Sequence, residues 1–128
     1  MIKPKILIID DDHSILEVLR FILEPEGYDV ETTPDAKRLF ARKDHFPNLI
    51  LLDLSLLGES GGNICRKLKQ NPKTKKIPVV LLSAHSPEHL KEEARSAKAD
   101  AFLPKPFDIE ILKAVVKKYY QPPVLPGS

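Results

Sequence analysis

The sequence lacks the features that would place it in a membrane, in an oxidising compartment or on a highly charged ligand. A single cysteine, Cys65, among 128 residues excludes an internal disulfide and fits a reducing compartment. The net charge of +2 is too small an excess to indicate nucleic-acid or membrane binding. No apolar run approaches the roughly 20 residues of a membrane span, and no signal peptide follows Met1. We therefore expect a cytoplasmic protein.

The length and composition are those of one globular domain. A chain of 128 residues, 42% hydrophobic and 30% charged, can bury a substantial core. We assign residues 1–120 to this domain. Residues 121–128 hold three prolines and a glycine, and we interpret them as a linker stub or an expression remnant. The densest lysine group, Lys73, Lys75 and Lys76, is interpreted as a solvated loop.

Short apolar runs alternate with stretches of helical spacing along the whole chain. The predicted strands are residues 5–9, 28–33, 49–53, 77–82 and 101–103. The predicted helices begin at residues 13, 33, 61, 86 and 108, and four of them have predicted ends at 24, 70, 98 and 119. Five strand–helix units in this order predict an α/β fold, with a doubly wound, five-stranded parallel sheet and right-handed crossovers. The second strand is the least apolar of the first four and is expected near an edge.

Several helical side chains are predicted to face the core because they recur at helical spacing. In the second and last helices these residues are Leu39, Phe40, Ile111, Leu112, Val115 and Val116. Cys65 lies in the helix predicted over residues 61–70. We expect its thiol to be packed rather than reactive.

The predicted strand from Leu49 to Asp53 is the centre of the sequence. Its first four residues are apolar without alternation, which is typical of a strand covered on both faces of a parallel sheet. The run ends in the carboxylate of Asp53, at the edge where open α/β sheets place their ligand crevice. We therefore expect Asp53 to be the chemical centre.

Polar groups follow the other predicted strands at the same edge. Asp10, Asp11 and Asp12 follow the first strand, Ser83 follows the fourth, and Lys105 follows the fifth. Two carboxylates about 4 Å apart repel by roughly 4 kcal/mol at an effective dielectric near 20, and a hard divalent cation such as Mg²⁺ relieves that repulsion. Singly, each group has an ordinary interpretation: Asp12 as a helix cap, Ser83 as a turn hydroxyl and Lys105 as a solvated side chain. Their joint occurrence favours a shared site.

Four motifs around these groups resemble the receiver domains of two-component response regulators, and the resemblance covers residues 5–119. The motifs occupy residues 7–12, 51–61, 80–84 and 102–107. The resemblance implies a flavodoxin-like (βα)5 fold. It further implies that Asp10, Asp11 and Asp53 bind Mg²⁺ together with the backbone carbonyl of Ser55.

The resemblance also implies the groups that handle phosphate. Asp53 would be the phosphoacceptor, Ser83 and Lys105 would contact the phosphoryl oxygens, and the peptide bond between Lys105 and Pro106 would be cis. Ser83 and Phe102 would form the switch pair. Phe102 departs from the tyrosine often found there, because it cannot donate a hydroxyl hydrogen bond. Leu57 replaces the family's usual proline, so the loop after Asp53 is expected to have a different shape.

The implied function is signalling rather than enzymatic turnover of a substrate. A sensor histidine kinase or a histidine phosphotransfer protein would phosphorylate Asp53 in the presence of Mg²⁺, and Ser55 and His85 would border the path of the water that later removes the phosphoryl group. The expected interaction face, residues 86–119, would then change and bind a downstream protein target or effector domain. This face includes Leu90, Ala94 and Ala97. Direct nucleic-acid or membrane binding is not expected.

Two alternatives remain open. Residues 9–14 also match the Asp-x-Asp-x-Ser/Thr start of haloacid-dehalogenase-type phosphatases, in which Asp10 would be the nucleophile and Asp12 the general acid/base. Against this, the chain is short, it has no cap insertion or paired acids after Lys105, and Asp53 would be left without a role. The second alternative is a pseudo-receiver, a binding module that no longer accepts phosphate.

Overall fold

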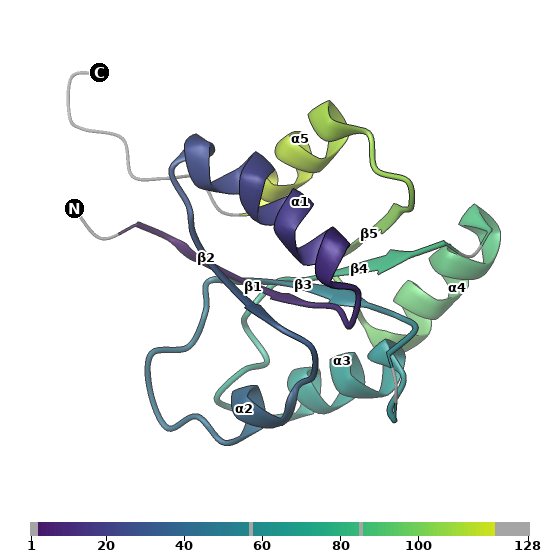
Figure 1. Cartoon of the computed structure of the whole chain (residues 1–128). Helices are drawn as coiled ribbons and strands as arrows, with labels where there is room; N and C mark the ends of the chain where they lie inside the picture. The colour runs from purple at the N-terminus through teal and green to yellow at the C-terminus, as the bar shows by residue number, and fades with distance from the viewer. Residues whose placement is uncertain (1–2, 57, 85, 120–128) are drawn as a thin grey trace.

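Five parallel strands form one sheet in the computed structural model, which describes residues 3–56, 58–84 and 86–119 (Figure 1). The order across the sheet is β2-β1-β3-β4-β5. The strands are β1 (Lys5–Ile9), β2 (Asp29–Thr33), β3 (Leu49–Asp53), β4 (Val79–Ser83) and β5 (Ala101–Pro104). The predicted doubly wound α/β fold is confirmed, and β2 lies at an edge as its composition predicts.

The helices form a layer on each face of the sheet (Figure 1). One layer consists of α1 (His13–Leu23) and α5 (Ile109–Tyr119). The other consists of α2 (Lys37–Phe40), α3 (Gly61–Gln70) and α4 (Pro87–Ala97). A short 3₁₀ segment, η1 (Glu24–Glu26), follows α1. Side chains alternate between the two faces of a strand, so each layer packs on its own set of strand residues.

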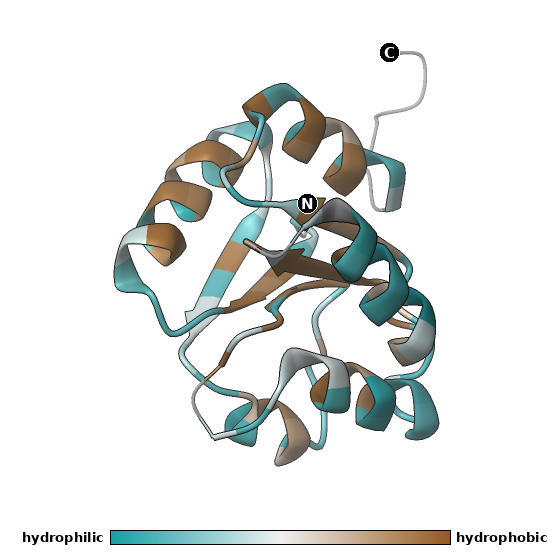
Figure 2. Cartoon of the chain, turned by 90° about the vertical axis from the view of Figure 1, so that its right-hand side faces the viewer, coloured by the Kyte–Doolittle hydropathy of each residue, from teal (hydrophilic) through white to brown (hydrophobic). Residues whose placement is uncertain are grey.

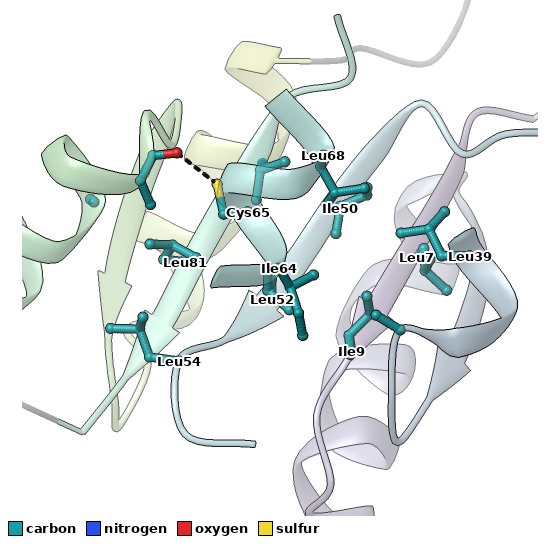
Figure 3. Packing of buried hydrophobic residues seen from close by; sticks show 14 of the residues in the cluster. Leu7, Ile9, Leu39, Ile50, Leu52, Leu54, Ile64, Cys65, Leu68 and Leu81 are labelled. Carbon is teal, nitrogen blue, oxygen red and sulfur yellow. Dashed lines mark hydrogen bonds between the residues drawn. The ribbon is translucent and has the colours of Figure 1, made fainter. Parts of the chain in front are cut away.

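The apolar core surrounds the central strand. Every residue of β3 is buried, as the unbroken apolar run predicts. Figure 3 shows the cluster under α2, α3 and α4, to which β3 contributes Ile50 and Leu52. Leu49 and Leu51 point to the opposite cluster under α1 and α5. In Figure 2 most of the sheet is brown between helices of mixed colour, because only one stripe of each helix is apolar. This rigid, dry centre fixes the position of Asp53.

Side-chain oxygens cap the starts of α1, α3 and α4, and Asp108 does the same for α5. Asp12 accepts a hydrogen bond from the backbone N–H of Ser14 at the start of α1. Ser60 accepts one from Asn63 in α3, and Ser86 accepts one from His89 in α4. Hydroxyl and carboxylate oxygens at this position satisfy N–H groups that the helix leaves unpaired. The predicted capping role of Asp12 is confirmed.

Two predicted core residues are instead exposed. Phe40 is 39% exposed, although its neighbour Leu39 is buried as predicted. The helix α2 has only one turn, because after it Arg42 turns to form an ion pair with Glu31 and donates a hydrogen bond to the His45 carbonyl. A single turn can bury one side only, and successive residues point about 100° apart. The exposed ring lines a pocket of about 390 Å³ beside the β3–α3 loop.

The other exception is Ile111, which is 53% exposed. The buried stripe of α5 is formed by Leu112 and Val116, one turn apart, and Ile111 falls outside it.

The predicted start of β4 was too early by two residues, since the strand begins at Val79, and its end includes Ser83.

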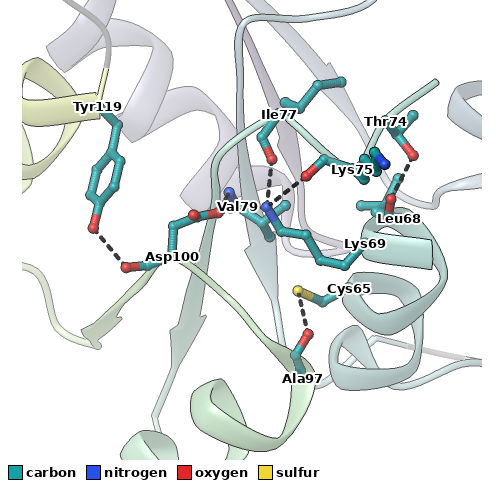
Figure 4. A network of polar contacts seen from close by, with 10 residues as sticks. All are labelled: Cys65, Leu68, Lys69, Thr74, Lys75, Ile77, Val79, Ala97, Asp100 and Tyr119. Carbon is teal, nitrogen blue, oxygen red and sulfur yellow. Dashed lines mark hydrogen bonds and ion pairs between the residues drawn. The ribbon is translucent and has the colours of Figure 1, made fainter. Parts of the chain in front are cut away.

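Several residues with two possible roles belong to the core. Leu90, Ala94 and Ala97 of α4 are buried against α3 and the sheet, so core packing accounts for them. The thiol of Cys65 is buried and donates to the Ala97 carbonyl (Figure 4), and burial raises its pKa to about 11. A thiol that stays protonated is a poor nucleophile. Lys73, Lys75 and Lys76 are exposed, as predicted for a solvated loop.

A network of polar contacts lies at the end of the sheet where β4 and β5 begin (Figure 4). The ammonium of Lys69 lies 2.7 Å from the carboxylate of Asp100 and 2.9 Å from the Ile77 carbonyl. The same carboxylate oxygen accepts the N–H of Val79 at 2.8 Å, and the carbonyl of Asp100 accepts the hydroxyl of Tyr119 at 2.6 Å. One aspartate therefore joins α3, β4 and α5.

Replacing Asp100 with alanine is expected to lower the free energy of unfolding by about 2 kcal/mol, because the N–H of Val79 and the ammonium of Lys69 lose an acceptor. Urea unfolding followed by circular dichroism measures the change. Asp44→Ala is the control, since that side chain is 81% exposed, and its effect should stay within about 0.5 kcal/mol. Equal effects of the two substitutions would contradict the stabilising role of the network.

Candidate phosphoacceptor site

The predicted site residues lie at one edge of the sheet, because all five strands run in the same direction. Asp10 follows the last residue of β1, and Asp53 is the last residue of β3. Ser83 is the last residue of β4, and Lys105 follows β5. This edge lies where the chain leaves β3 and β4 for α3 and α4 (Figure 1). The sheet thus brings together residues that are up to 95 positions apart in the chain.

The ammonium of Lys105 joins two of the acids. Its Nζ lies 2.9 Å from Oδ2 of Asp10 and 3.2 Å from Oδ1 of Asp53. Asp10 is 1% exposed and Asp53 is 5% exposed, so both carboxylates are withdrawn from bulk water. Hydrogen bonds between ionised groups are stronger than neutral ones. Lys105 therefore fixes the orientation of both acids.

Backbone contacts hold these side chains in place. The other oxygen of Asp10 accepts the N–H of Asp12 at 3.0 Å, and the N–H of Lys105 donates to the Ser83 carbonyl at 2.8 Å. The peptide bond between Lys105 and Pro106 is cis, as the resemblance implies. The acids and the lysine are thus held by the chain itself.

The electrostatic environment opposes a full negative charge on Asp53. Burial is the main cause of a raised pKa for its carboxyl group, and the neighbouring charge of Asp10 adds to it. Lys105 and a hydrogen bond from the backbone of Ser55 lower the pKa, but the net direction is upward. For Lys105, burial opposes the charge, but the hydrogen bond with Asp10 and the charges of Asp53 and Asp10 outweigh it. The pKa of the ammonium is therefore raised.

Three carboxylates form a group that could hold a metal ion. One oxygen each from Asp10, Asp11 and Asp53 lies within 4.8 Å of the others. The donor set is entirely oxygen, two of its members are buried, and they repel one another, which fits a small, hard cation such as Mg²⁺. A bound cation would offset the repulsion that raises the pKa of Asp53.

Replacing Asp53 with asparagine is expected to raise the free energy of unfolding in metal-free buffer at neutral pH. The carboxyl group of Asp53 binds its proton more tightly in the folded protein than in the unfolded chain. The wild type is therefore most stable relative to the variant below the ordinary pKa of 3.8. It loses that advantage as the pH rises through the folded-state pKa. Urea unfolding with EDTA from pH 3.5 to 8 should show the variant gaining on the wild type over this interval. A variant that is less stable at every pH would contradict the prediction.

The structure describes three of the remaining predicted residues, Ser55, Ser83 and Phe102. Ser83 is buried at the edge, and Phe102 is partly buried in β5, where it pairs in register with Leu81. Leu57 and His85 lie outside the described residues. The resemblance implies a role for the Ser55 carbonyl, and in the structure the backbone of Ser55 also forms a hydrogen bond with the carboxylate of Asp53. No side-chain pattern signals a backbone contact of this kind.

Comparison with known proteins gives a consistent result. A family model described as the response regulator receiver domain matches residues 6–117. The phosphate regulon transcriptional regulatory protein PhoB of Rhizobium meliloti is 35% identical over 115 residues, which cover 89% of this chain and 51% of that protein. The response regulator PleD of Caulobacter vibrioides is 36% identical, over 90% of this chain and 26% of that protein. The chain thus spans about half or less of the length of these relatives.

Solved structures are similar over nearly the whole fold. A putative response regulator from Chloroflexus aurantiacus has a TM-score of 0.85 and 31% identity, covering 91% of this chain and 98% of that one. The chemotaxis protein CheY4 of Vibrio cholerae has a TM-score of 0.80 and 28% identity, covering 92% and 99% of the two chains. Among the described residues, no helix is both long and apolar enough to cross a bilayer.

Proposed function

Because the chain belongs to the response regulator receiver domain family, a family of phosphoacceptor domains in two-component signalling, we propose that Asp53 is the residue that accepts the phosphoryl group. The observation that supports this role is the position of its carboxylate at the end of β3, 3.2 Å from the ammonium of Lys105 and grouped with the carboxylates of Asp10 and Asp11. Asp53 alone among these acids ends the fully buried central strand.

The transfer proceeds by nucleophilic attack. An oxygen of the Asp53 carboxylate bonds to the phosphorus of a phosphohistidine on a sensor histidine kinase or a histidine phosphotransfer protein. The phosphorus–nitrogen bond breaks, and the imidazole leaves with the electron pair and takes a proton from solvent. The ammonium of Lys105 lies 3.2 Å from Oδ1 of Asp53. From there its charge stabilises the negative charge that is spread over the oxygens of the transferring phosphoryl group. The chain supplies placement and charge, and it performs only its own phosphorylation and dephosphorylation.

Mg²⁺ fits the three carboxylates of Asp10, Asp11 and Asp53 and, when bound, supplies neutralisation of phosphate charge. We assign the backbone carbonyl of Ser55 as a further ligand. The ion pair between Lys105 and Asp10 already offsets part of the negative charge of the three carboxylates before a metal ion binds.

Phosphorylation changes the charge at the end of β3, and this change is the signal. A phosphoryl group adds strong acceptor oxygens, toward which the hydroxyl of Ser83 turns. Phe102, partly buried in the neighbouring strand, then moves into the space that Ser83 leaves. The surface of β5 and its flanking helices changes, and a downstream protein target or effector domain binds it. Some relatives are named as transcriptional regulators, such as PhoB, but output through a protein partner is what we propose here.

Incubation of the protein with Mg²⁺ and acetyl phosphate, followed by intact-mass spectrometry, tests the proposal. The wild type should gain one phosphoryl group, and the gain should disappear in Asp53→Asn and with EDTA. Asp44→Asn, an exposed acid away from the site, is the matched control and should keep the gain. A wild type that gains nothing under these conditions would favour the pseudo-receiver alternative.

The phosphatase alternative receives no support from the site. Its general acid/base would be Asp12, whose side chain caps α1 by accepting the N–H of Ser14. Its nucleophile would be Asp10, which would leave Asp53, the last residue of the fully buried central strand, without a role. Absence of turnover with a generic phosphate ester is the expected result.

A further inference from the structure

The first turn of α3 lies directly against the backbone of the proposed nucleophile. The N–H of Gly61, the first residue of the helix, donates to the carbonyl of Leu54 at 2.9 Å. On its other side, the N–H of Leu54 donates to the carbonyl of Leu82 in β4 at 2.9 Å. Leu54, the residue that follows Asp53, is therefore held between a strand and a helix.

The approach is so close that position 61 has no room for a side chain. A Cβ at Gly61 would lie 2.1 Å from the Asp53 carbonyl oxygen and 2.8 Å from the Cα of Leu54. These neighbours are backbone atoms at the end of β3, and they cannot rotate away as a side chain can. The next residue is different, since a Cβ at Gly62 would meet only side-chain ends, the nearest being Oε2 of Glu93 at 3.3 Å.

A displacement here would reach the reacting atoms. Asp53 carries both the backbone carbonyl next to Gly61 and the reacting carboxylate, whose Oδ1 lies 3.2 Å from Nζ of Lys105. To restore even a 3.0 Å contact, the 2.1 Å separation must grow by 0.9 Å. The core cannot absorb this freely, because α3 is anchored by buried Ile64 and Leu68. A misplacement of about 1 Å at a reacting group can slow a reaction by about 10²-fold.

We propose that Gly61 is a positioning residue for Asp53: its missing side chain lets α3 press on the Asp53–Leu54 peptide and so holds the carboxylate where it can accept phosphate. This inference rests on the proposed function, because it concerns the geometry of the same nucleophile. The role is distinct from helix capping, which Ser60 performs by accepting the N–H of Asn63.

The test compares Gly61→Ala with Gly62→Ala in the whole 128-residue protein. Both glycines are buried in the first turn of α3, so the two variants share the gain in helix propensity and the added methyl group. The readouts are the rate of phosphoryl uptake from acetyl phosphate at saturating Mg²⁺, the dissociation constant for Mg²⁺, and thermal unfolding. We expect Gly61→Ala to be about 10- to 100-fold slower while folded, and Gly62→Ala to stay within about twofold of the wild type.

A third variant separates placement from loss of stability. Leu112→Ala opens the core on the opposite face of the sheet and should lower the melting temperature while leaving the uptake rate of the folded protein unchanged. If Gly61→Ala does not fold in buffer, the measurement is repeated in 1 M trehalose, which favours the compact state. Failure to fold there too would overturn the proposal, because glycine would then serve the fold rather than the nucleophile.

The remaining outcomes are also distinct. Equal uptake rates for folded Gly61→Ala and the wild type overturn the role of Gly61 and leave the proposed function standing. Equal slowing in both glycine variants also overturns it, since position 62 does not touch the Asp53 backbone. A wild type that takes up no phosphoryl group overturns the proposed function and this inference with it.

Discussion

Replacement of Lys105 by methionine is expected to slow phosphorylation of Asp53 by about 10²- to 10³-fold, the usual loss when a prearranged electrostatic donor is removed. Among the described residues, Lys105 is the one cation that the structure pairs with both Asp10 and Asp53. Methionine has the same unbranched shape as lysine but lacks the terminal ammonium, so the loss reports on the charged group. The rate of mass gain with acetyl phosphate at saturating Mg²⁺ measures it.

The same variant should change the pH dependence in a defined direction. Lys105 lowers the pKa of Asp53, although burial and Asp10 raise it more, so removing the ammonium raises the pKa further. The nucleophile is the ionised carboxylate, and the residual rate should therefore reach its plateau at higher pH than in the wild type. Lys91→Met, on the exposed surface of α4, is the control and should react within about twofold of the wild type. An unshifted profile or an undiminished rate for Lys105→Met would contradict this role.

Replacement of Asp11 by asparagine is expected to weaken Mg²⁺ binding by about 10²- to 10³-fold. Its carboxylate belongs to the group of three whose oxygens lie within 4.8 Å of one another. Two unit charges 4 Å apart interact by roughly 4 kcal/mol at an effective dielectric near 20, which is a factor of about 10³ and the upper end of this range. The ion pairs of Lys105 are with Asp10 and Asp53, so the substitution of Asp11 removes neither partner. Isothermal titration with MgCl₂ gives the affinity.

The adjacent acid supplies a matched control for this experiment. Asp12→Asn removes one negative charge one residue away, while asparagine caps a helix as well as aspartate does. Its Mg²⁺ affinity should stay within about threefold of the wild type. If the two variants weaken binding equally, Mg²⁺ is attracted by the general charge of the β1–α1 loop rather than held by Asp11.

The residues of the site could be predicted because parallel strands end at one edge. The unbroken apolar run before Asp53 predicted a strand buried on both faces, and each of its residues is buried. The acids after the first strand and the lysine after the fifth then had to lie near Asp53, and Lys105 lies within 3.2 Å of it. The start and end of α3 were also predicted correctly, since Ser60 caps it at one end and Asn71-Pro72 follows the other.

Other features could not be predicted from the spacing of apolar residues. Spacing identifies an apolar stripe but not its width, so Ile111 was expected in the core, whereas the fully buried residues of α5 are Leu112 and Val116. The prediction for Phe40 failed because an ion pair between Arg42 and Glu31, on different elements, accompanies the end of α2 after one turn. Such contacts join residues that no local pattern relates.

Three features could be read along the chain: the order of strands and helices, the edge where the reactive groups gather, and the kinds of atoms found there. They follow from local periodicity and from the common direction of parallel strands. The distances among Asp10, Asp53 and Lys105, the raised pKa of Asp53 and the close approach of Gly61 to the Asp53 backbone became known from the folded structure. Each of these depends on how closely separate elements pack and how much water they exclude, and packing is a property of the whole fold.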